Sequence, residues 1–433
     1  MPKVFNKQAF PAVLLAFFIA STAGASQTPD ELVQIAWDAN PGLTALQANI
    51  EAAKQKILQS GAWKDPVVAV EYSNVPVDSF ELGDHAMSGV QLRIQQTFPF
   101  PGKTSKRRES AGFSAVAASF EYQEKRNRLR LMIKTAYWQL AESRVLEKMI
   151  VEQIDQVKKL VVSVKSRYEV GATAQHELLK LEVLKSRLED EAADFHRRDV
   201  ELTAAINAML HRLPDTPVET PDEIKVIAPV ASSDVYIDKA KSSNPALMRL
   251  TEISRAGRAA ARRARYEAWP DPTIWAGYRI REEVKNDQGM VMDEGVDFAS
   301  VGLSVPIPFS YSKGWGAAKQ ESLASSHAAE SLRLALFDEI QGDIMGTLAA
   351  WRRARKKHAH YRDKILPAQM QTIKAARAAY EVGRANFSSL YDAQIALIDM
   401  RRTIIGAAAR TRILEAKMES LVGEGLAGEG GES

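Results

Sequence analysis

A short segment near the end of the chain has a copy about half a chain earlier. Tyr380-Glu381-Val382-Gly383 ends one long amphipathic stretch and opens another, and Tyr168-Glu169-Val170-Gly171 stands in the same setting. Glycine permits the left-handed backbone of a tight reversal, so each segment is expected to form the tip of a helical hairpin. A hairpin that occurs twice indicates a chain built from two structural repeats.

Other landmarks recur in the same order, each about 200 to 215 residues later. They are Asn40-Pro41 and Asn244-Pro245, Asp65-Pro66 and Asp271-Pro272, Pro99-Phe100-Pro101 and Pro306-Ile307-Pro308, and Trp138 and Trp351. One shared dipeptide is weak evidence, but a series at nearly constant spacing is strong. The chain is therefore divided into a first repeat (residues 26–213), a proline-rich linker (214–232), a second repeat (233–422) and a tail rich in glycine and glutamate (423–433), which is expected to be flexible.

Residues 1–25 have the pattern of a secretory signal peptide. Lys3 and Lys7 form a basic start, an apolar run follows, and Ala23-Gly24-Ala25 is a cleavage site of small residues. A membrane anchor is disfavoured, because the apolar run is far shorter than the roughly 20 residues that a spanning helix needs. The chain has no cysteine, which excludes disulfides, thiolate metal sites and a lipid-modified N-terminal cysteine. A formal charge of +3 gives no reason to expect a nucleic-acid partner.

Four segments change from helical periodicity to an alternation of apolar and polar residues. They are residues 67–75, 88–98, 273–281 and 298–307. In the second of these, apolar residues at 90, 92 and 94 alternate with Gln91, Arg93 and Gln95. This pattern predicts strands that separate an apolar environment from a polar one.

Helical periodicity occupies most of the remaining chain. In the first repeat it runs without interruption from Lys103 to Val170, a helix on the order of 100 Å long. The spacing near its end is that of a coiled-coil seam, formed by Ile150, Ile154, Val157, Val161, Val164 and Tyr168. The second repeat predicts a matching helix from Trp315 to Val382, with a kink at Pro367.

Four strands of this length suit a membrane but cannot span it as an isolated sheet. In lipid every backbone N–H and C=O must be paired, and about eight strands form the smallest barrel with a filled interior. Copies of the chain must therefore pool their strands; a trimer gives a 12-stranded barrel with its polar faces toward a water-filled lumen, and 12 long helices for a helical barrel. A soluble sandwich with a coiled-coil arm remains an alternative, but it does not explain the uniform polar faces or the helix lengths.

Over its whole mature length the chain resembles the TolC-like outer membrane efflux proteins. The resemblance is carried by the twofold repeat, by TFPFPGK at Thr97–Lys103 and by residues 365–394, ILPAQMQTIKAARAAYEVGRANFSSLYDAQ. It implies a homotrimeric channel, with a β-barrel in the lipid of a Gram-negative outer membrane and an α-helical barrel in the periplasm. It also implies two partners, a periplasmic adaptor (membrane fusion protein) and an inner-membrane pump of the RND type.

TFPFPGK and the compact build are most similar to the heavy-metal branch of this family, the cobalt–zinc–cadmium and copper–silver efflux channels. Multidrug and type I secretion channels of the same fold remain alternatives. Relatives with an acylated N-terminal cysteine differ from this chain, which has none.

The resemblance also assigns roles to individual residues. The adaptor is expected to dock on the hairpin tips at Val170, Gly171, Val382 and Gly383, and the joints between barrel and helices are expected at Pro99, Pro101, Gly102, Pro306 and Pro308. Family members place acidic residues just past the second tip, where they ring the entrance. Asp392 matches one such position, Ser389 departs from the other, and Glu177 stands similarly past the first tip. Three copies of Asp392 facing one lumen would attract cations.

No residue pattern favours catalysis or a bound cofactor. We find no Ser/His/Asp set, no GxSxG elbow, no phosphate loop and no HExxH pair. His358 and His360 are two residues apart, so they lie on different faces of a helix and suit a shared metal poorly. A periplasmic adaptor or scaffold would also have a long helical hairpin, but one hairpin with compact β-domains rather than two hairpins interleaved with four strands.

Overall fold

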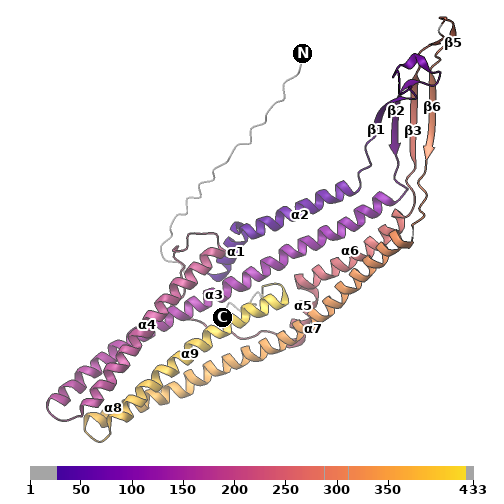
Figure 1. Ribbon diagram of the computed structural model, residues 1–433. Helices are drawn as coiled ribbons and strands as arrows, with labels where there is room; N and C mark the ends of the chain where they lie inside the picture. Colours follow the sequence, from indigo (N-terminus) through magenta and orange to yellow (C-terminus); the bar gives the residue numbers. More distant parts are fainter. Residues whose placement is uncertain (1–26, 287, 311, 426–433) are drawn as a thin grey trace.

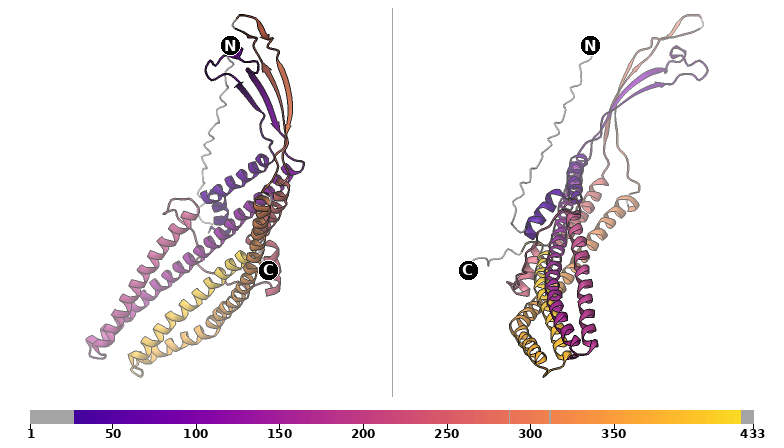
Figure 2. Two further views of the ribbon diagram at one scale, coloured as in Figure 1. Left: turned by 45° about the vertical axis from the view of Figure 1, so that its right-hand side comes forward. Right: turned by 90° about the vertical axis from the view of Figure 1, so that its left-hand side faces the viewer.

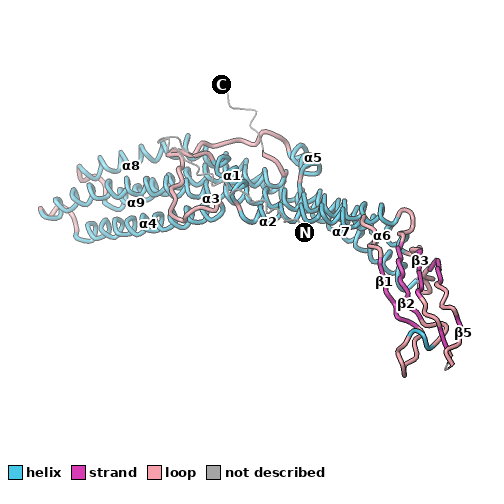
Figure 3. Tube along the Cα trace, turned by 90° about the horizontal axis from the view of Figure 1, so that it is seen from above, coloured by secondary structure: helices cyan, strands magenta, loops and turns pink. Residues whose placement is uncertain are grey.

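The computed structural model describes residues 27–286, 288–310 and 312–425, so the predicted signal peptide lies outside the described residues. The molecule is long and narrow. A four-stranded sheet forms one end, and the tips of two helical hairpins form the other (Figures 1 and 3). Two further views show the same arrangement, with the helices between sheet and tips running along the long axis (Figure 2).

Each repeat contributes two short helices, two strands of the main sheet and a long helical hairpin. The first repeat comprises α1 (Pro29–Ala39), α2 (Pro41–Ser60), β1 (Val67–Ser73), η1 (Leu82–Asp84), β2 (Gly89–Thr97), α3 (Lys103–Glu169) and α4 (Gln175–Met209). The second comprises α5 (Ser233–Ser243), α6 (Pro245–Glu267), β3 (Thr273–Ile280), β4 (Val284–Lys285), β5 (Val291–Asp293), β6 (Phe298–Ser304), η2 (Ser312–Gly316), α7 (Ala317–His360), η3 (Tyr361–Ile365), α8 (Leu366–Glu381) and α9 (Phe387–Val422). Between β3 and β6, β4 and β5 form a separate two-stranded sheet.

The main sheet has the order β1-β2-β3-β6, with every neighbouring pair antiparallel. The register places apolar residues in rows across the strands. One row is Val68, Ile94, Ala276 and Val301, and the next is Val70, Leu92, Tyr278 and Ala299. The large side chains of these rows are exposed, as a face turned to lipid requires.

The opposite face of the sheet is polar and carries its own cross-strand contacts. The guanidinium of Arg93 lies 5.0 Å from the ring centre of Trp275. Nη2 of Arg279 donates to Oε1 of Gln91 at 3.0 Å, and Gln91 is buried by this contact. The alternation predicted from the sequence is therefore confirmed: one face of the sheet is apolar and exposed, and the opposite face is polar.

The repeated Asn-Pro dipeptide has the same structural role in both halves. Asn40 and Asn244 each cap a helix that starts at the following proline, accepting N–H groups at Oδ1. The other end of each amide donates across the molecule, from Asn40 Nδ2 to Met209 O at 3.0 Å and from Asn244 Nδ2 to Leu421 O at 2.9 Å. Each asparagine thereby ties the start of its repeat to the last helix of the same repeat.

The long helix of the first repeat follows its predicted seam, with one exception. Ile150, Ile154, Val157 and Val164 are buried, and Val161 is half-buried. Tyr168 was expected to continue this seam, but its side chain is 41% exposed. That expectation was wrong: α3 ends at Glu169, one residue after Tyr168, so no further turn of the helix extends the seam past it.

The second long helix is interrupted where Pro367 predicts a kink. The segment η3 (Tyr361–Ile365) is a π-helical turn between α7 and α8, and Pro367 lies in the first turn of α8. Proline lacks an N–H and clashes with the carbonyl four residues earlier, so the regular α-helical ladder cannot pass through this point. The π-helical turn absorbs the interruption.

The two repeats interlock through their helices. Helix α9 packs against α3 of the first repeat as well as against α7 and α8 of its own, and α4 packs against α3. Three apolar clusters stabilise this arrangement, one where α1, α3, α4 and the linker meet, one near the tips, and one around α5, α7 and α9. Val218 and Ile224 of the linker are buried in the first cluster. Within the described residues, no helix is long and apolar enough to cross a membrane.

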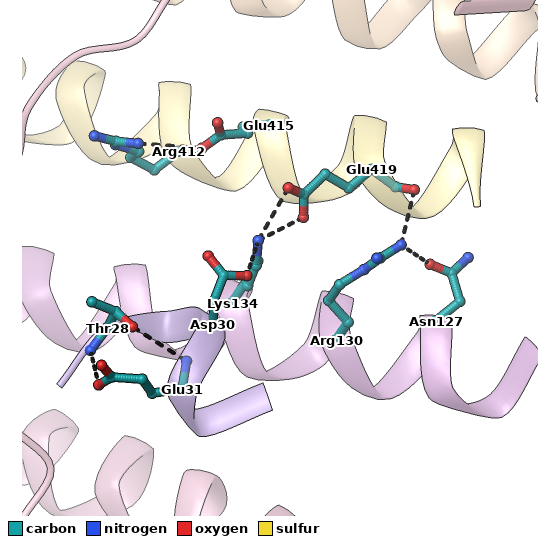
Figure 4. Close-up of polar contacts among 9 residues, drawn as sticks. All are labelled: Thr28, Asp30, Glu31, Asn127, Arg130, Lys134, Arg412, Glu415 and Glu419. Atoms are coloured by element: carbon teal, nitrogen blue, oxygen red, sulfur yellow. Dashed lines mark hydrogen bonds and ion pairs between the residues drawn. The ribbon is translucent and has the colours of Figure 1, made fainter. Parts of the chain in front are cut away.

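A buried ion pair also joins the two repeats (Figure 4). Lys134 of α3 lies 2.8 Å from Oε2 of Glu419 on α9 and 2.7 Å from Oδ1 of Asp30 on α1. Burial opposes the charge on Lys134, but the two carboxylates together hold the pKa of its amine above the ordinary value. Beside this pair, Nη2 of Arg130 donates to the backbone oxygen of Glu419 at 3.3 Å.

Replacing Glu419 with glutamine should destabilise the protein by about 3 kcal/mol, because it leaves the buried ammonium of Lys134 with only Asp30. Denaturant unfolding of the detergent-solubilised protein measures this change. Glu424→Gln is the matched control: Glu424 pairs with Lys239 at the exposed surface, 3.9 Å away, and should change the stability by under about 0.5 kcal/mol. Equal stability of the two variants would contradict a stabilising role for the buried pair.

Candidate functional site

The two hairpin tips have the same backbone geometry. Gly171 and Gly383 each have a φ of +73°, and each helix ends one residue earlier in a cap at Val170 or Val382. The N–H of Gly171 donates to Tyr168 O at 2.9 Å, and that of Gly383 to Tyr380 O at 3.1 Å. The returning helices, α4 and α9, begin at equivalent residues.

Both tips present their turns to the outside. Val170 and Val382 are exposed at 78% and 68%. A Cβ added to Gly171 or Gly383 would meet nothing within 4 Å. The four predicted docking residues thus form two free surfaces at one end of the molecule.

The tips contact one another through Glu177 and Tyr380. The hydroxyl of Tyr380 donates to Oε2 of Glu177 at 3.2 Å, and the hydroxyl of Thr173 also donates to this carboxylate oxygen. Tyr380 is only 6% exposed. The contact therefore holds the start of α4 against the end of α8.

Arg167 completes this contact from the last turn of α3. Its guanidinium lies 4.9 Å from the ring centre of Tyr380, and Nη1 donates to Glu381 O at 3.1 Å. Three residues of the first tip, Arg167, Thr173 and Glu177, thus surround one tyrosine of the second tip. We call these four residues the tip clasp.

The tip clasp occurs on one side only. Tyr168 occupies the position in the first repeat that Tyr380 occupies in the second, but it is exposed. The second repeat has Ala379, Ala385 and Ser389 where the first has Arg167, Thr173 and Glu177. The second tip thus has none of the polar groups that hold Tyr380.

The predicted entrance residues do not come together in one protomer. Glu177 belongs to the tip clasp, whereas Ser389 lies in the first turn of α9, where its hydroxyl donates to Asn386 Oδ1 at 2.8 Å. Asp392 is exposed on α9 and accepts a hydrogen bond of 3.4 Å from Ser388. The sequence interpretation missed Arg167, Thr173 and Tyr380, although Tyr380 was inside the repeated tip motif. The signal was the loss of polar residues around the second copy of that motif.

The first junction between sheet and helices is locked by buried charges. Gly102 starts α3 with a φ of +91°, and a Cβ there would lie 2.7 Å from the ring of Tyr266. Lys103 is buried, with Nζ 2.7 Å from Oδ1 of Asp271, which also accepts the N–H of Phe100 at 2.8 Å. Burial disfavours ionisation of Asp271, but these partners hold its pKa below the ordinary value.

Stacked rings reinforce this junction, since Phe100, between Pro99 and Pro101, lies parallel to Trp269 at 5.0 Å. The second junction lacks these contacts. Pro306 and Pro308 are exposed, and Phe309 beside them is 91% exposed. The two junctions therefore differ: the segment around Phe100 packs against Trp269 and Asp271 of the second repeat, whereas the segment around Phe309 is exposed.

In the part of the chain that the structure describes, no group of three or more histidine, aspartate or glutamate side chains is placed to hold a metal ion. His358 is partly buried, and burial together with the neighbouring Arg362 lowers its pKa.

Sheet, hairpins and tips together define a class of two-repeat proteins in which the strands of one antiparallel sheet continue into long helical hairpins. The family model for outer membrane efflux proteins matches residues 32–198 and 236–424, one match in each repeat. The chain therefore belongs to the outer membrane efflux protein family. This is a family of channel proteins rather than enzymes.

Solved structures share this fold across nearly the whole chain. A membrane protein from Pseudomonas aeruginosa has a TM-score of 0.77 and 16% identity over 92% of this chain and 91% of its own. VceC of Vibrio cholerae has a TM-score of 0.75 and 17% identity, covering 92% and 96%. The CmeC outer membrane channel of Campylobacter jejuni has a TM-score of 0.72 and 13% identity, covering 98% and 94%. No curated protein sequence matches the chain significantly.

Replacing Tyr380 with phenylalanine should loosen the tips, because it removes the hydrogen bond to the Glu177 carboxylate while keeping the ring under Arg167. Hydrogen bonds to charged groups contribute about 1.5 to 3 kcal/mol, which corresponds to roughly tenfold or faster amide exchange where local opening governs exchange. Amide hydrogen exchange in the two turns measures this loosening of the tips. Tyr168→Phe is the control at the equivalent, exposed position and should leave exchange unchanged; similar exchange in both variants would show that the clasp does not hold the tips.

Proposed function

We propose that this protein is the outer membrane channel of a tripartite efflux system, acting as a homotrimer. It conducts passively what an inner-membrane pump of the RND type and a periplasmic adaptor deliver to it. The observation that carries the proposal is the sheet: four antiparallel strands of seven to nine residues with one exposed apolar face and two edges that pair with no other described strand.

The edges of the sheet require further strands. Within the described residues, β1 and β6 each pair on one side only. Val70 of β1 and Val301 of β6 are 71% and 79% exposed on the apolar face. In lipid the free backbone groups of these edges would be costly, and a β6 edge against the β1 edge of another copy continues the antiparallel order. Three copies make a closed barrel of twelve strands, wide enough for a lumen.

The helices have matching free edges. α3 packs against α9 inside the protomer, and the repeat predicts the equivalent contact between α7 and α8 of one copy and α4 of the next. Apolar residues are exposed on both of these edges. They are Leu179, Val183 and Val200 on α4 and Leu332, Leu334, Met345 and Met370 on α7 and α8. Assembly of three protomers into a ring would thus both cover the apolar edges of the helices and pair the edges of the sheets.

The free tips support docking to the adaptor. Val170, Gly171, Val382 and Gly383 lie at the end of the molecule farthest from the sheet, and their turns are open to solvent (Figure 1). A partner that binds end-on would reach these residues first. The hydrophobic valines beside the glycines offer apolar contact to it.

The substrate class we propose is heavy-metal cations, on the similarity of TFPFPGK and the compact build to the heavy-metal branch. Multidrug or type I secretion channels share the fold and remain the alternative. A periplasmic scaffold is disfavoured, because its surroundings are aqueous and an exposed apolar sheet face is costly in water.

Replacing Gly383 with tryptophan should abolish efflux-dependent resistance, because it places a large ring on the docking surface. Gly383→Ala carries the same strain from the positive φ without the bulk, so it should retain most resistance. Both variants should still fractionate with the outer membrane as trimers, which separates lost docking from lost assembly. Full resistance in the tryptophan variant would refute docking at this turn.

Deleting the gene should sensitise the cell to metal salts if the heavy-metal assignment is right. Growth on zinc, cobalt, cadmium, copper and silver salts is compared with growth on dyes, detergents and antibiotics. We expect sensitivity to metal ions alone, restored by the intact gene. Sensitivity to organic compounds alone would keep the channel and reject the metal substrate.

A further inference from the structure

We propose that the channel mouth carries two stacked rings of alternating positive and negative charge, formed by Lys180 with Asp392 and by Arg187 with Asp399. This inference rests on the proposed trimeric channel and goes beyond it. It replaces the expected acidic entrance with a charge-balanced one.

The two repeats place these residues at equivalent points. Helices α4 and α9 start at Gln175 and Phe387, directly after turns of identical geometry. Lys180 and Asp392 are each the sixth residue of their helix. The residues that follow them, Leu181 and Ala393, are both buried. The two helices therefore turn equivalent faces toward the core and toward solvent.

The same reversal of sign recurs on the same helix face. Seven residues further along, Arg187 on α4 corresponds to Asp399 on α9. Seven residues are close to two turns, so Arg187 lies almost directly beyond Lys180, about 10 Å deeper from the tips. α4 thus carries two cations where α9 carries two anions.

Three of these four charges form no ion pair in the described part of the protomer, and the fourth, Asp399, forms an exposed one. In the described chain, neither Lys180 nor Arg187 forms an ion pair, and both are exposed. Asp392 meets only the hydroxyl of Ser388. Asp399 pairs with Arg402 of its own helix at 3.3 Å, an exposed contact of little energy. Opposite charges that find no partner in one copy are available to each other around a ring.

Closing three protomers into a barrel places six equivalent helix starts around the mouth. At each level the sequence of charges is then positive, negative, positive, negative, with a net charge of zero. Contraction of the mouth brings each lysine toward two aspartates, so attraction favours the narrow state. Salt screens such pairs, with a Debye length of about 10 Å at 0.1 M and 3 Å at 1 M, so opening should become easier at high ionic strength.

The test is the cation-to-anion permeability ratio of the full-length channel in planar lipid bilayers under a KCl gradient. The wild-type ratio should be near unity. Lys180→Glu makes the first ring wholly acidic and should raise the ratio several-fold, whereas Asp392→Lys should lower it several-fold. The double variant Lys180→Asp with Asp392→Lys exchanges the signs and should return the ratio toward the wild-type value. Lys241→Glu, on exposed α5, makes the same charge change away from the mouth and should have no effect.

The outcomes separate the two proposals. If Asp392→Lys changes the ratio and Lys180→Glu does not, the lumen is ringed by acids alone, and the alternating ring is overturned while the channel stands. If neither variant changes the ratio of a conducting channel, both residues lie off the lumen and the ring is overturned. If the wild-type protein conducts nothing, the proposed function fails as well.

Discussion

The unpaired edges of the sheet are the constraint on which the rest of the structure depends. A four-stranded sheet with an apolar outer face is costly in water, and its open edges are costly in lipid. Both costs disappear when copies join edge to edge. The same closure covers the exposed apolar residues of α4, α7 and α8 and brings the free tips into one ring. The assembly of copies edge to edge thus satisfies the sheet, the helices and the tips at the same time.

The two repeats offer similar surfaces for joining copies edge to edge, but the contacts that they make inside one protomer differ. Two contacts that join the repeats inside the protomer have counterparts that are not made there. Lys103 holds Asp271, while Asp65, the equivalent aspartate, is exposed. Glu177 holds Tyr380, while Tyr168 is exposed.

Much of the fold could be predicted from the sequence because its signals are periodic. The alternation of apolar and polar residues predicted all four long strands, helical spacing predicted the hairpins, and Pro367 predicted where the second long helix is interrupted. The asymmetry could not be predicted, because it depends on which neighbour each residue meets. Tyr168 and Tyr380 have identical local sequence, Tyr-Glu-Val-Gly, yet one is exposed and the other buried. The tip clasp likewise joins residues about 200 positions apart. Asp392 was recognised as an entrance candidate, and the repeat offset places Lys180 at the equivalent position of α4, but the sequence interpretation did not make this comparison.

Cysteine cross-linking across the sheet seam tests the central claim most directly. The natural chain has no cysteine, so a pair introduced on β1 and β6 reports only on itself. β1 and β6 are separated by β2 and β3 within a protomer, which prevents an internal disulfide between them. A set of pairs around Val70 and Val301 covers neighbouring registers. After mild oxidation in outer membranes, we predict that at least one pair gives covalent trimers on a denaturing gel. Monomers at every register would contradict a barrel shared by three copies.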